Sequence, residues 1–285
     1  MRTVLRKTPT SLFCAMLLFG LAGGNMVCAG ALPGFSRNRV AVEGAELSYL
    51  KRPGPGPVLV LIPGSFVGAE DFTGVVDGLS ADLSILIVEL RGHGESWPPP
   101  SHGTIERFAG DVLAAVDHAG VRRFYVGGHS IGGMIAVEIA GRRPVSVLGA
   151  IPIEGWTHHL VAKEAFGGQN DSTLSATHRE RIAKLREPVM TRWTQEQRTE
   201  FAAIWRQWSG LEILRRTPVP VLEIWGDRGR SRPSMEQMQI PDRPNIELYW
   251  VAGASHYLPL ERPDEVAGAI NRFVERVGRI SPGRQ

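Results

Sequence analysis

Hydrophobic positions in this chain gather in short runs that alternate with longer stretches of helical spacing. The runs are rich in β-branched and aromatic residues and are bounded by Gly or Pro, which is typical of fully buried strands. Strands are predicted at Val58–Ile62, Ile85–Glu89, Phe124–Gly128, Val147–Ile153, Val221–Trp225 and Ile246–Val251. Helices are predicted near Phe72–Leu79, Ile105–Ala119, Ser130–Arg142 and Pro263–Val277. This alternation predicts an α/β fold, in which a parallel sheet has helices on both faces.

One connection is much longer than the others. No strand signal occurs over residues 155–218, and a connection of that length normally has structure of its own. Within it, TQEQRTEFAAIWRQW opens with a capping box of Thr194 and Gln197 and continues with aromatic residues at helical spacing as far as Trp208. We therefore expect a helical cap at residues 155–218, inserted into a sheet domain formed by residues 30–154 and 219–285.

The aromatic residues around this connection have two interpretations. They bury the small core of the cap itself, or some of them line an apolar substrate pocket. For the second role the candidates are Trp156, at the start of the cap, and Phe66, in the loop after the first predicted strand.

The start of the chain has a different character. A basic segment, MRTVLRK, precedes an apolar run, LFCAMLLFGLAGG, that is short for a bilayer span, and small residues follow. This order predicts a signal peptide at residues 1–29, hence a secreted or periplasmic protein with no stable membrane span after processing; an uncleaved anchor is the alternative. Cys14 and Cys28, the two cysteines of the chain, both fall in this leader. No disulfide or thiolate chemistry is therefore expected in the mature chain.

Net charge and composition limit the kinds of partner that this protein is expected to bind. The net charge of the chain is +3, and Arg2, Arg6 and Lys7 of the leader, which has no Asp or Glu, account for all of it. The mature chain thus has no basic excess that would attract nucleic acid or an anionic membrane. A chain of 285 residues, 43% hydrophobic, can hold a large core without metal or disulfide. We expect a small-molecule substrate, no cofactor and no metal, and the pattern does not indicate an oligomeric state.

A serine at a predicted strand–helix junction is the first candidate for chemistry. In FYVGGHSIGGM an apolar strand passes through Gly128, Ser130 and Gly132 into a helix. The two glycines remove side chains that would clash in a sharp turn, and the helix N-terminus provides positive potential where an oxyanion forms. In this context the pattern predicts that Ser130 is a nucleophile.

Ser130 needs a base, because a serine hydroxyl alone is a weak nucleophile at neutral pH. His256 follows the last predicted strand and precedes a helix, which puts it at the same sheet edge as Ser130. The other histidines lie in early loops, in a helix, beside the nucleophile or in the cap, and fit less well. For the oxyanion hole we expect the backbone N–H groups of Ile131, directly after the nucleophile, and of Ser65, in the loop after the first predicted strand.

Four segments in this order resemble the α/β-hydrolase superfamily over nearly the whole mature chain: LIPGSFVG, ELRGHGES, GGHSIGG and GASHYLPLERP. The resemblance implies a mostly parallel eight-stranded sheet with a helical cap after the sixth strand. Two differences from the family are local. Pro63 stands where the family usually has His in the oxyanion loop, and Glu89 stands where it commonly has Asp, at a position that is usually structural.

The third difference concerns the acid that fixes the tautomer of the base. The family usually supplies it three residues after a glycine, in the loop after the seventh strand. Here Gly226 is followed at that distance by Gly229, and Asp227, the only carboxylate of the loop, comes two residues early. In certain haloalkane dehalogenases and lipases the acid follows the sixth strand instead, where this chain has Glu154. We favour Glu154 over Asp227, and a purely structural Glu154 is a further alternative.

These features predict a secreted serine hydrolase that cleaves a carboxylic ester through an acyl-enzyme on Ser130, with His256 as the base and Glu154 as the acid. An acyltransferase, lactonase, amidase or perhydrolase on the same scaffold is the alternative, because these share the triad and differ in the nucleophile that reaches the acyl-enzyme. A non-catalytic ligand-binding module has no need of an intact Ser–His pair. A dehalogenase is disfavoured, since its nucleophile is a carboxylate.

Overall fold

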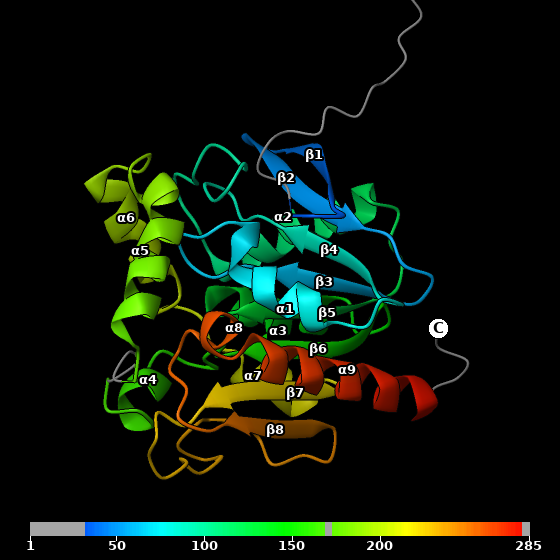
Figure 1. Cartoon of the computed structure of the whole chain (residues 1–285), viewed down its shortest axis with the longest axis vertical. Helices are drawn as coiled ribbons and strands as arrows, with labels where there is room; N and C mark the ends of the chain where they lie inside the picture. The colour runs from blue at the N-terminus through cyan, green and yellow to red at the C-terminus, as the bar shows by residue number, and fades with distance from the viewer. Residues whose placement is uncertain (1–31, 169–172, 281–285) are drawn as a thin grey trace, which may run out of the picture.

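Eight strands form one sheet that runs through the molecule (Figure 1). The computed structural model describes residues 32–168 and 173–280, so the predicted signal peptide, residues 1–29, lies outside the described part. The strands are β1 (Ser36–Val42), β2 (Ala45–Arg52), β3 (Val58–Ile62), β4 (Ser84–Val88), β5 (Phe124–His129), β6 (Val147–Ile153), β7 (Val221–Gly226) and β8 (Ile246–Val251). Their spatial order is β1-β2-β4-β3-β5-β6-β7-β8.

The strands from β3 to β8 are parallel to one another, whereas β2 pairs antiparallel with both β1 and β4. The mostly parallel sheet is therefore confirmed, and each strand predicted from the hydrophobic pattern is present, with ends that differ by one residue at most. The pattern does not predict β1 and β2, because β1 is an edge strand without a buried residue and β2 is buried only in its middle. The carboxyl ends of β3 to β8 share one sheet edge, which is where ligand sites of such sheets lie.

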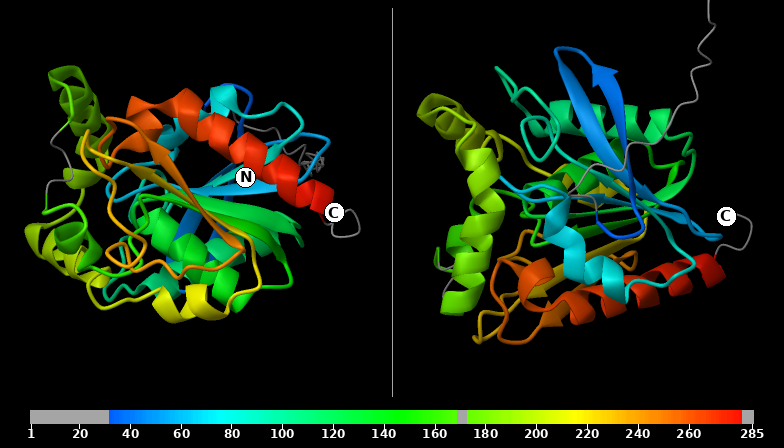
Figure 2. Two further views of the ribbon diagram at one scale, coloured as in Figure 1. Left: turned by 90° about the horizontal axis from the view of Figure 1, so that it is seen from below. Right: turned by 45° about the horizontal axis from the view of Figure 1, so that its top comes forward.

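Helices cover both faces of the sheet, as predicted (Figure 2). On one face α1 (Thr73–Gly78), which follows a short 3-10 helix (Ala69–Phe72), packs with α8 (Leu258–Glu261) and α9 (Pro263–Ile280). On the other face α3 (Ile131–Arg142) packs with α2 (Ile105–His118) and α7 (Leu211–Arg216). No helix among the described residues is both long and apolar enough to cross a membrane.

Each face of the sheet buries its own hydrophobic layer. Successive side chains of a strand point to opposite faces, and β3 shows this directly, since Val60 and Ile62 enter one layer while Leu59 and Leu61 enter the other. All seven residues of β6 are buried. This two-sided burial is what makes the parallel strands so easy to predict from sequence.

The long connection between β6 and β7 is helical, in agreement with the pattern. Its described part holds α4 (Val161–Glu164), α5 (Ala176–Met190), α6 (Gln195–Ile204) and α7. Helices α4, α5 and α6 lie together to one side of the sheet (Figures 1 and 2), whereas α7 packs on α3. The capping box is confirmed, because Thr194 Oγ1 accepts from the N–H of Gln197 and Gln197 Oε1 accepts from the N–H of Thr194. The cap boundaries, residues 155–218, stay a prediction.

Two indoles attach this connection to the sheet domain. Nε1 of Trp193 donates to the carbonyl oxygen of Gly92 over 2.7 Å, and Nε1 of Trp208 donates to Glu138 Oε2 over 3.0 Å. Both tryptophans are buried. Helix α6 ends at Ile204 rather than at Trp208, so Trp208 reaches Glu138 from the segment that follows the helix.

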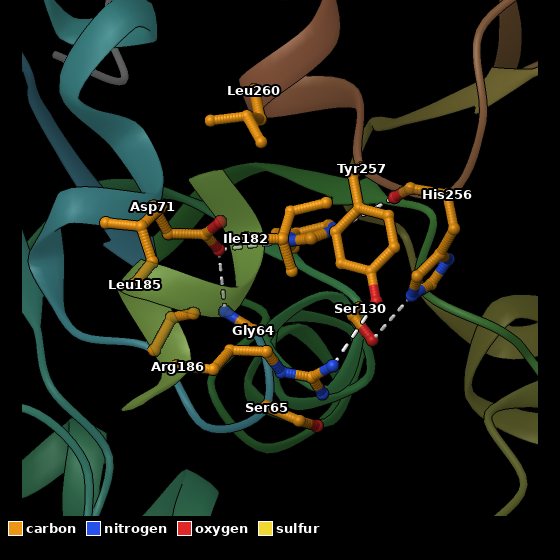
Figure 3. Close-up of a pocket in the computed structure, with 12 residues that line it drawn as sticks. Gly64, Ser65, Asp71, Ser130, Ile182, Leu185, Arg186, His256, Tyr257 and Leu260 are labelled. Carbon is orange, nitrogen blue, oxygen red and sulfur yellow. Dashed lines mark hydrogen bonds and ion pairs between the residues drawn. The ribbon is translucent and has the colours of Figure 1, made fainter. Parts of the chain in front are cut away.

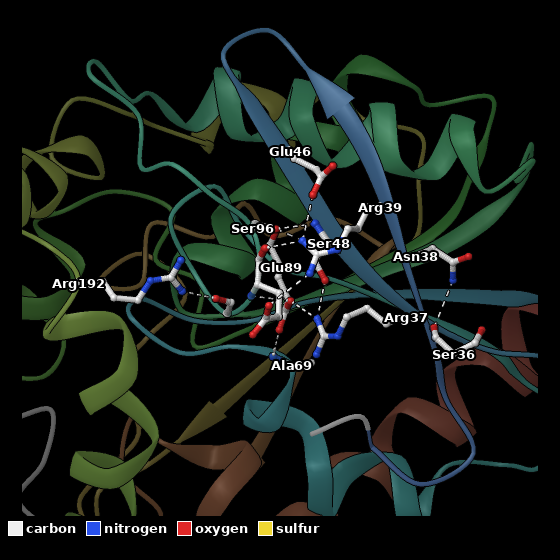
Figure 4. A network of polar contacts seen from close by, with 12 residues as sticks. Ser36, Arg37, Asn38, Arg39, Glu46, Ser48, Ala69, Glu89, Ser96 and Arg192 are labelled. Carbon is white, nitrogen blue, oxygen red and sulfur yellow. Dashed lines mark hydrogen bonds and ion pairs between the residues drawn. The ribbon is translucent and has the colours of Figure 1, made fainter. Parts of the chain in front are cut away.

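The carboxylate of Glu89 links three segments beside the site (Figure 4). It accepts from Nη1 of Arg37 in β1 over 2.6 Å, from the N–H of Ala69 over 3.1 Å and from the N–H of Glu95 over 3.0 Å. Glu89 is 1% exposed. Its contacts are those of a structural residue, as the resemblance implies.

Candidate active site

Ser130 stands on a sharp turn between β5 and α3. Its backbone has φ of 55° and ψ of −119°, a conformation that residues other than glycine seldom adopt outside functional sites. The flanking glycines make the turn possible: a Cβ on Gly128 would lie 2.3 Å from the backbone of Gly132, and one on Gly132 would lie 2.1 Å from the carbonyl oxygen of Ile62. The turn therefore has the strand–glycine–serine–glycine–helix form that the sequence predicts.

Three candidate residues meet in one chain of hydrogen bonds at the carboxyl edge of the sheet. The Ser130 hydroxyl donates to Nε2 of His256 over 3.0 Å (Figure 3), and Nδ1 of His256 donates to Oε2 of Glu154 over 3.2 Å. The N–H is assigned to Nδ1 because a carboxylate can only accept. Ser130 follows β5, Glu154 follows β6, and His256 lies in the loop after β8. The parallel topology thus joins residues that are up to 126 positions apart in the sequence.

The carboxylate of Glu154 is fully buried and is held at both oxygens. Oε1 accepts from the N–H of Gly226 over 2.7 Å and from Nη1 of Arg228 over 2.6 Å, while Oε2 accepts from Nη2 of Arg228 over 2.6 Å. Burial raises the pKa of the Glu154 carboxyl, but Arg228 and His256 together outweigh burial and bring the pKa to about 2. Glu154 is therefore ionised at neutral pH and can orient His256.

Asp227 does not contact His256 in this structure. Its Oδ1 accepts from the N–H of Gly229 over 2.9 Å and from the N–H of Gly253 over 2.7 Å, so it joins the loop after β7 to the turn after β8. The partner of His256 is Glu154, and Asp227 has the contacts of a loop-fixing carboxylate.

A second buried ion pair lies next to the nucleophile and lines the same cavity. Nδ1 of His129 donates to Asp71 Oδ2 over 2.8 Å, and Nε2 donates to the carbonyl oxygen of His256 over 2.8 Å. Asp71 Oδ2 also accepts from the N–H of Gly64 over 2.8 Å. Burial lowers the pKa of the His129 imidazole, but Asp71, the His256 carbonyl and Glu154 together outweigh burial and the pKa is raised. A protonated His129, with both nitrogens donating, therefore joins the loops of the nucleophile, the base and the predicted oxyanion hole.

The pKa of the base, His256, is shifted in the opposite direction to that of His129. Burial is the largest influence on the pKa of His256 and lowers it, and the contact with Glu154 offsets only part of that effect. His256 is therefore neutral at neutral pH, which is the form that accepts a proton from Ser130.

The N–H groups predicted to form the oxyanion hole have no acceptor. Within the part of the chain that the structure describes, the backbone N–H groups of Ser65 and Ile131 donate no hydrogen bond. Ser65 lines the same cavity as Ser130, and Ile131 is the first residue of α3. Both donors are thus available to an oxyanion, and their role stays a prediction.

A narrow cavity lies in front of Ser130 (Figure 3). Its volume is about 40 Å³, which holds a few water molecules. Helix α5 and the segment at the start of α8 supply its outer wall, with Ile182, Leu185, Arg186, Tyr257 and Leu260. No group of three or more His, Cys, Asp or Glu side chains that could hold a metal ion occurs among residues 32–168 and 173–280.

Neither aromatic candidate for the substrate pocket lines this cavity. The centre of the Trp156 ring lies 5.3 Å from that of His256, and the centre of the Phe66 ring lies 4.9 Å from that of Phe201. Both residues are buried. Their contact with substrate stays a prediction.

Arg228 and Asp71 have no local signal that marks them as parts of the site. Arg228 belongs to the segment GDRGRSRP, where no spacing rule separates it from Arg230 or Arg232. The available hint was indirect: a carboxylate at the end of a fully buried strand, such as Glu154, needs a cation nearby, and the neighbouring loop is rich in arginine.

Comparison with known proteins identifies the class of this chain. Residues 59–269 match the model of the family described as Alpha/beta hydrolase family. The chain therefore belongs to the α/β hydrolase family, and the resemblance seen in its sequence is confirmed. As a class, it is a hydrolase of the esterase and lipase type.

Individual relatives are distant but cover most of the chain. A predicted esterase/lipase of Haemophilus influenzae is 24% identical over 246 residues, which are 77% of this chain and 84% of that protein. A membrane phospholipase A, a bacterial virulence factor, superposes with a TM-score of 0.69 at 23% identity, covering 86% of this chain and 87% of its own. A thermophilic esterase from Thermogutta terrifontis superposes with a TM-score of 0.67 at 21% identity, covering 85% and 99%. The phospholipase and the thermophilic esterase thus share the fold of this chain.

Proposed function

We propose that this hydrolase cleaves carboxylic esters through an acyl-enzyme on Ser130, with His256 as general base and Glu154 as the acid that orients it. One observation carries the proposal, namely the continuous hydrogen bonding from the Ser130 hydroxyl through His256 to the buried Glu154 carboxylate. A module that only binds ligands has no use for a neutral histidine poised between a serine and a charged carboxylate.

The reaction has two halves that use the same groups. As Ser130 Oγ attacks the acyl carbon, His256 Nε2 takes the hydroxyl proton, and Glu154 stabilises the imidazolium. The oxyanion accepts from the N–H groups of Ser65 and Ile131. His256 then gives the proton to the alcohol oxygen, the ester C–O bond breaks, and the alcohol leaves. Water attacks the acyl-enzyme in the same way, and its proton returns to Ser130 as the acid is released.

A chain-length series of p-nitrophenyl esters tests this function. The wild type should release p-nitrophenol and favour short acyl groups, because the cavity beside Ser130 is small. Ser130→Ala should lose about three orders of magnitude or more in kcat/KM, since the nucleophile is gone. Ser80→Ala, at an exposed serine, is the matched control and should behave as the wild type. Full activity in Ser130→Ala would rule out the proposed mechanism.

For the location we propose export directed by residues 1–29, on the support of the basic start and the apolar run that follows it. Expression of the full chain and of a chain that starts at residue 30 in a Gram-negative host, followed by fractionation, tests this. The full chain should be found in the periplasm or the medium with its leader removed, and the shortened chain in the cytoplasm. The same distribution of both proteins would contradict export.

A further inference from the structure

One charged residue lies on the otherwise apolar helix face that α5 turns toward Ser130. Ile182, Leu185 and Arg186 share this face, because they are spaced by three and four residues, and all three line the cavity (Figure 3). Val189 continues the stripe and is buried. A helix that only covers the nucleophile would carry an apolar residue at position 186 as well.

The Arg186 guanidinium has few partners in the protein. Nη1 donates to the phenolic oxygen of Tyr257 over 3.4 Å, which is long, and the guanidinium carbon lies 5.6 Å from the centre of the Phe66 ring. Nε is buried and finds no acceptor among the described residues. No Asp or Glu oxygen in that part of the chain lies within 4.0 Å of the side chain. Because a guanidinium has five N–H donors, most of them have no partner among the described residues.

The other groups of the cavity do not neutralise this charge. Asp71 is the one carboxylate among the lining residues, and it is paired with His129 over 2.8 Å. Burial lowers the pKa of His256, so the base is neutral at neutral pH. Arg186 therefore leaves the space in front of the nucleophile electropositive.

We propose that Arg186 binds a carboxylate group of the substrate, so that the preferred esters carry an ionised acid a few bonds from the scissile ester. This inference rests on the proposed function and names its substrate class. A carboxylate matches the planar fork of a guanidinium, and a cavity of about 40 Å³ accepts only a compact group. The carboxylate belongs either to the acyl part or to the alcohol part of the ester.

Two pairs of isosteric esters separate these sources. Monomethyl succinate and methyl levulinate differ only at the end of the acyl chain, where one has a carboxylate and the other a methyl ketone. Acetoxyacetate and acetoxyacetone have the same difference on the alcohol side. Titration of the released acid gives kcat/KM for each ester, and the anionic-to-neutral ratio within each pair measures the recognition of charge. The wild type should favour the anionic member of at least one pair.

Substitutions of Arg186 test whether the preference for anionic esters depends on its guanidinium. Arg186→Gln keeps hydrogen-bonding ability but loses the charge, so the anionic-to-neutral ratio should fall about ten- to a hundredfold. The kcat/KM for the neutral esters should fall much less than that for the anionic esters, whereas a merely structural role of Arg186 predicts an equal loss for both. Arg186→Lys should retain part of the preference. Arg181→Gln, at an exposed arginine of the same helix, is the matched control and should leave the ratio unchanged.

The possible outcomes distinguish failure of this inference from failure of the proposed esterase function. If the wild type hydrolyses the neutral esters through Ser130 but shows no anionic preference, or a preference that Arg186→Gln retains, the role of Arg186 is wrong and the esterase stands. If no ester is hydrolysed, the proposed function is wrong, and a binding measurement then tests the role of Arg186. Calorimetry should then find that monomethyl succinate or acetoxyacetate binds Ser130→Ala at least tenfold more tightly than Ser130→Ala/Arg186→Gln; equal binding or none for both compounds overturns the inference.

Discussion

Arg228 and Glu154 form a buried bidentate ion pair directly behind the histidine of the site. Nη1 and Nη2 of Arg228 each donate over 2.6 Å, one to each oxygen of the carboxylate. Arg228 is 3% exposed, Glu154 is 0% exposed, and the guanidinium carbon lies 3.8 Å from the centre of the Phe166 ring. Because the pair is neutral as a unit, Glu154 orients His256 while part of its negative charge is already compensated.

Removal of the Arg228 charge should move the acid limb of the pH profile upward. Burial lowers the pKa of His256 most strongly, Glu154 raises it, and His129 and Arg228 lower it further. Arg228→Met should therefore raise the pKa of His256, so that kcat/KM begins to fall at a higher pH than in the wild type. Profiles of kcat/KM against pH measure this, and Arg228→Lys, which keeps the charge, should remain near the wild type. An acid limb that Arg228→Met leaves in place would contradict the interpretation.

The two candidate acids should respond differently to loss of charge. Glu154→Gln removes the negative charge that fixes the His256 tautomer and stabilises the imidazolium, and it should lower kcat by about three to four orders of magnitude. Asp227→Asn should keep nearly the full rate, because Asp227 pairs with the N–H groups of Gly229 and Gly253 and with Arg232, and not with His256. Steady-state hydrolysis of a short ester compares them. A large loss in Asp227→Asn with little change in Glu154→Gln would make our assignment of the acid wrong.

The ion pair of His129 and Asp71 should make stability depend on pH. The raised pKa of His129 stabilises the folded state fully below its ordinary value of about 6.5, and this contribution is lost as pH rises through the folded value. Burial raises the pKa of Asp71, but His129, the N–H of Gly64 and His256 together outweigh burial and the pKa is lowered. Its contribution is present above about pH 3.9 and is lost as pH falls through the folded value.

Asp71→Asn should therefore lower the free energy of unfolding by about 3–5 kcal/mol near pH 5.5, and by less at higher pH. Urea unfolding of the wild type and the variant between pH 5 and pH 9 gives this difference directly. A difference that does not change with pH, or that grows toward pH 9, is the result this account excludes.

Ionisation of the Glu223 carboxyl should destabilise the folded state. It is fully buried, Trp225 Nε1 donates to Oε2 over 3.0 Å, and Oε1 finds no partner among the described residues. Burial raises the pKa of the Glu223 carboxyl to about 8. The folded state thus holds a proton that the unfolded chain releases above about pH 4.3, and stability falls as pH rises from there toward 8.

Glu223→Gln should remove this loss, because a glutamine can still accept from Trp225 and does not ionise. Relative to the wild type, the free energy of unfolding of Glu223→Gln should be higher at pH 8 than at pH 5. Urea unfolding at these two pH values tests it, and an offset between the two proteins that is equal at both would show that Glu223 does not titrate as described.

Local signals account for what could be predicted from the sequence. Strands β3 to β8 are continuous apolar runs because both of their faces are buried, and Ser130 is marked by the glycines that its turn requires. Glu154 could be predicted only because an acid is missing elsewhere: position 229 is a glycine where the family usually has an acid. β1 has no such signal, because an edge strand with exposed residues lacks a buried run.

The contacts that adjust the site could not be predicted, because they join residues far apart in the chain. Arg228 lies 74 positions from Glu154, and His129 lies 58 positions from Asp71. In each case the residue type is common and the spacing is arbitrary, so that only the packing of neighbouring loops makes the pair. Arg186 could not be predicted for a similar reason, since an arginine on a helix such as α5 is ordinarily a solvated side chain.

Covalent labelling tests the central claim most directly, namely that Ser130 is a nucleophile activated by His256 and Glu154. A fluorophosphonate mimics the acyl centre and remains bound to the oxygen that attacks it. Peptide mass spectrometry of the labelled wild type should find one adduct, on Ser130, none in Ser130→Ala, and a steep fall in the labelling rate of His256→Ala and Glu154→Gln. An adduct on another residue, or labelling of Ser130 at an unchanged rate without His256, would contradict the account.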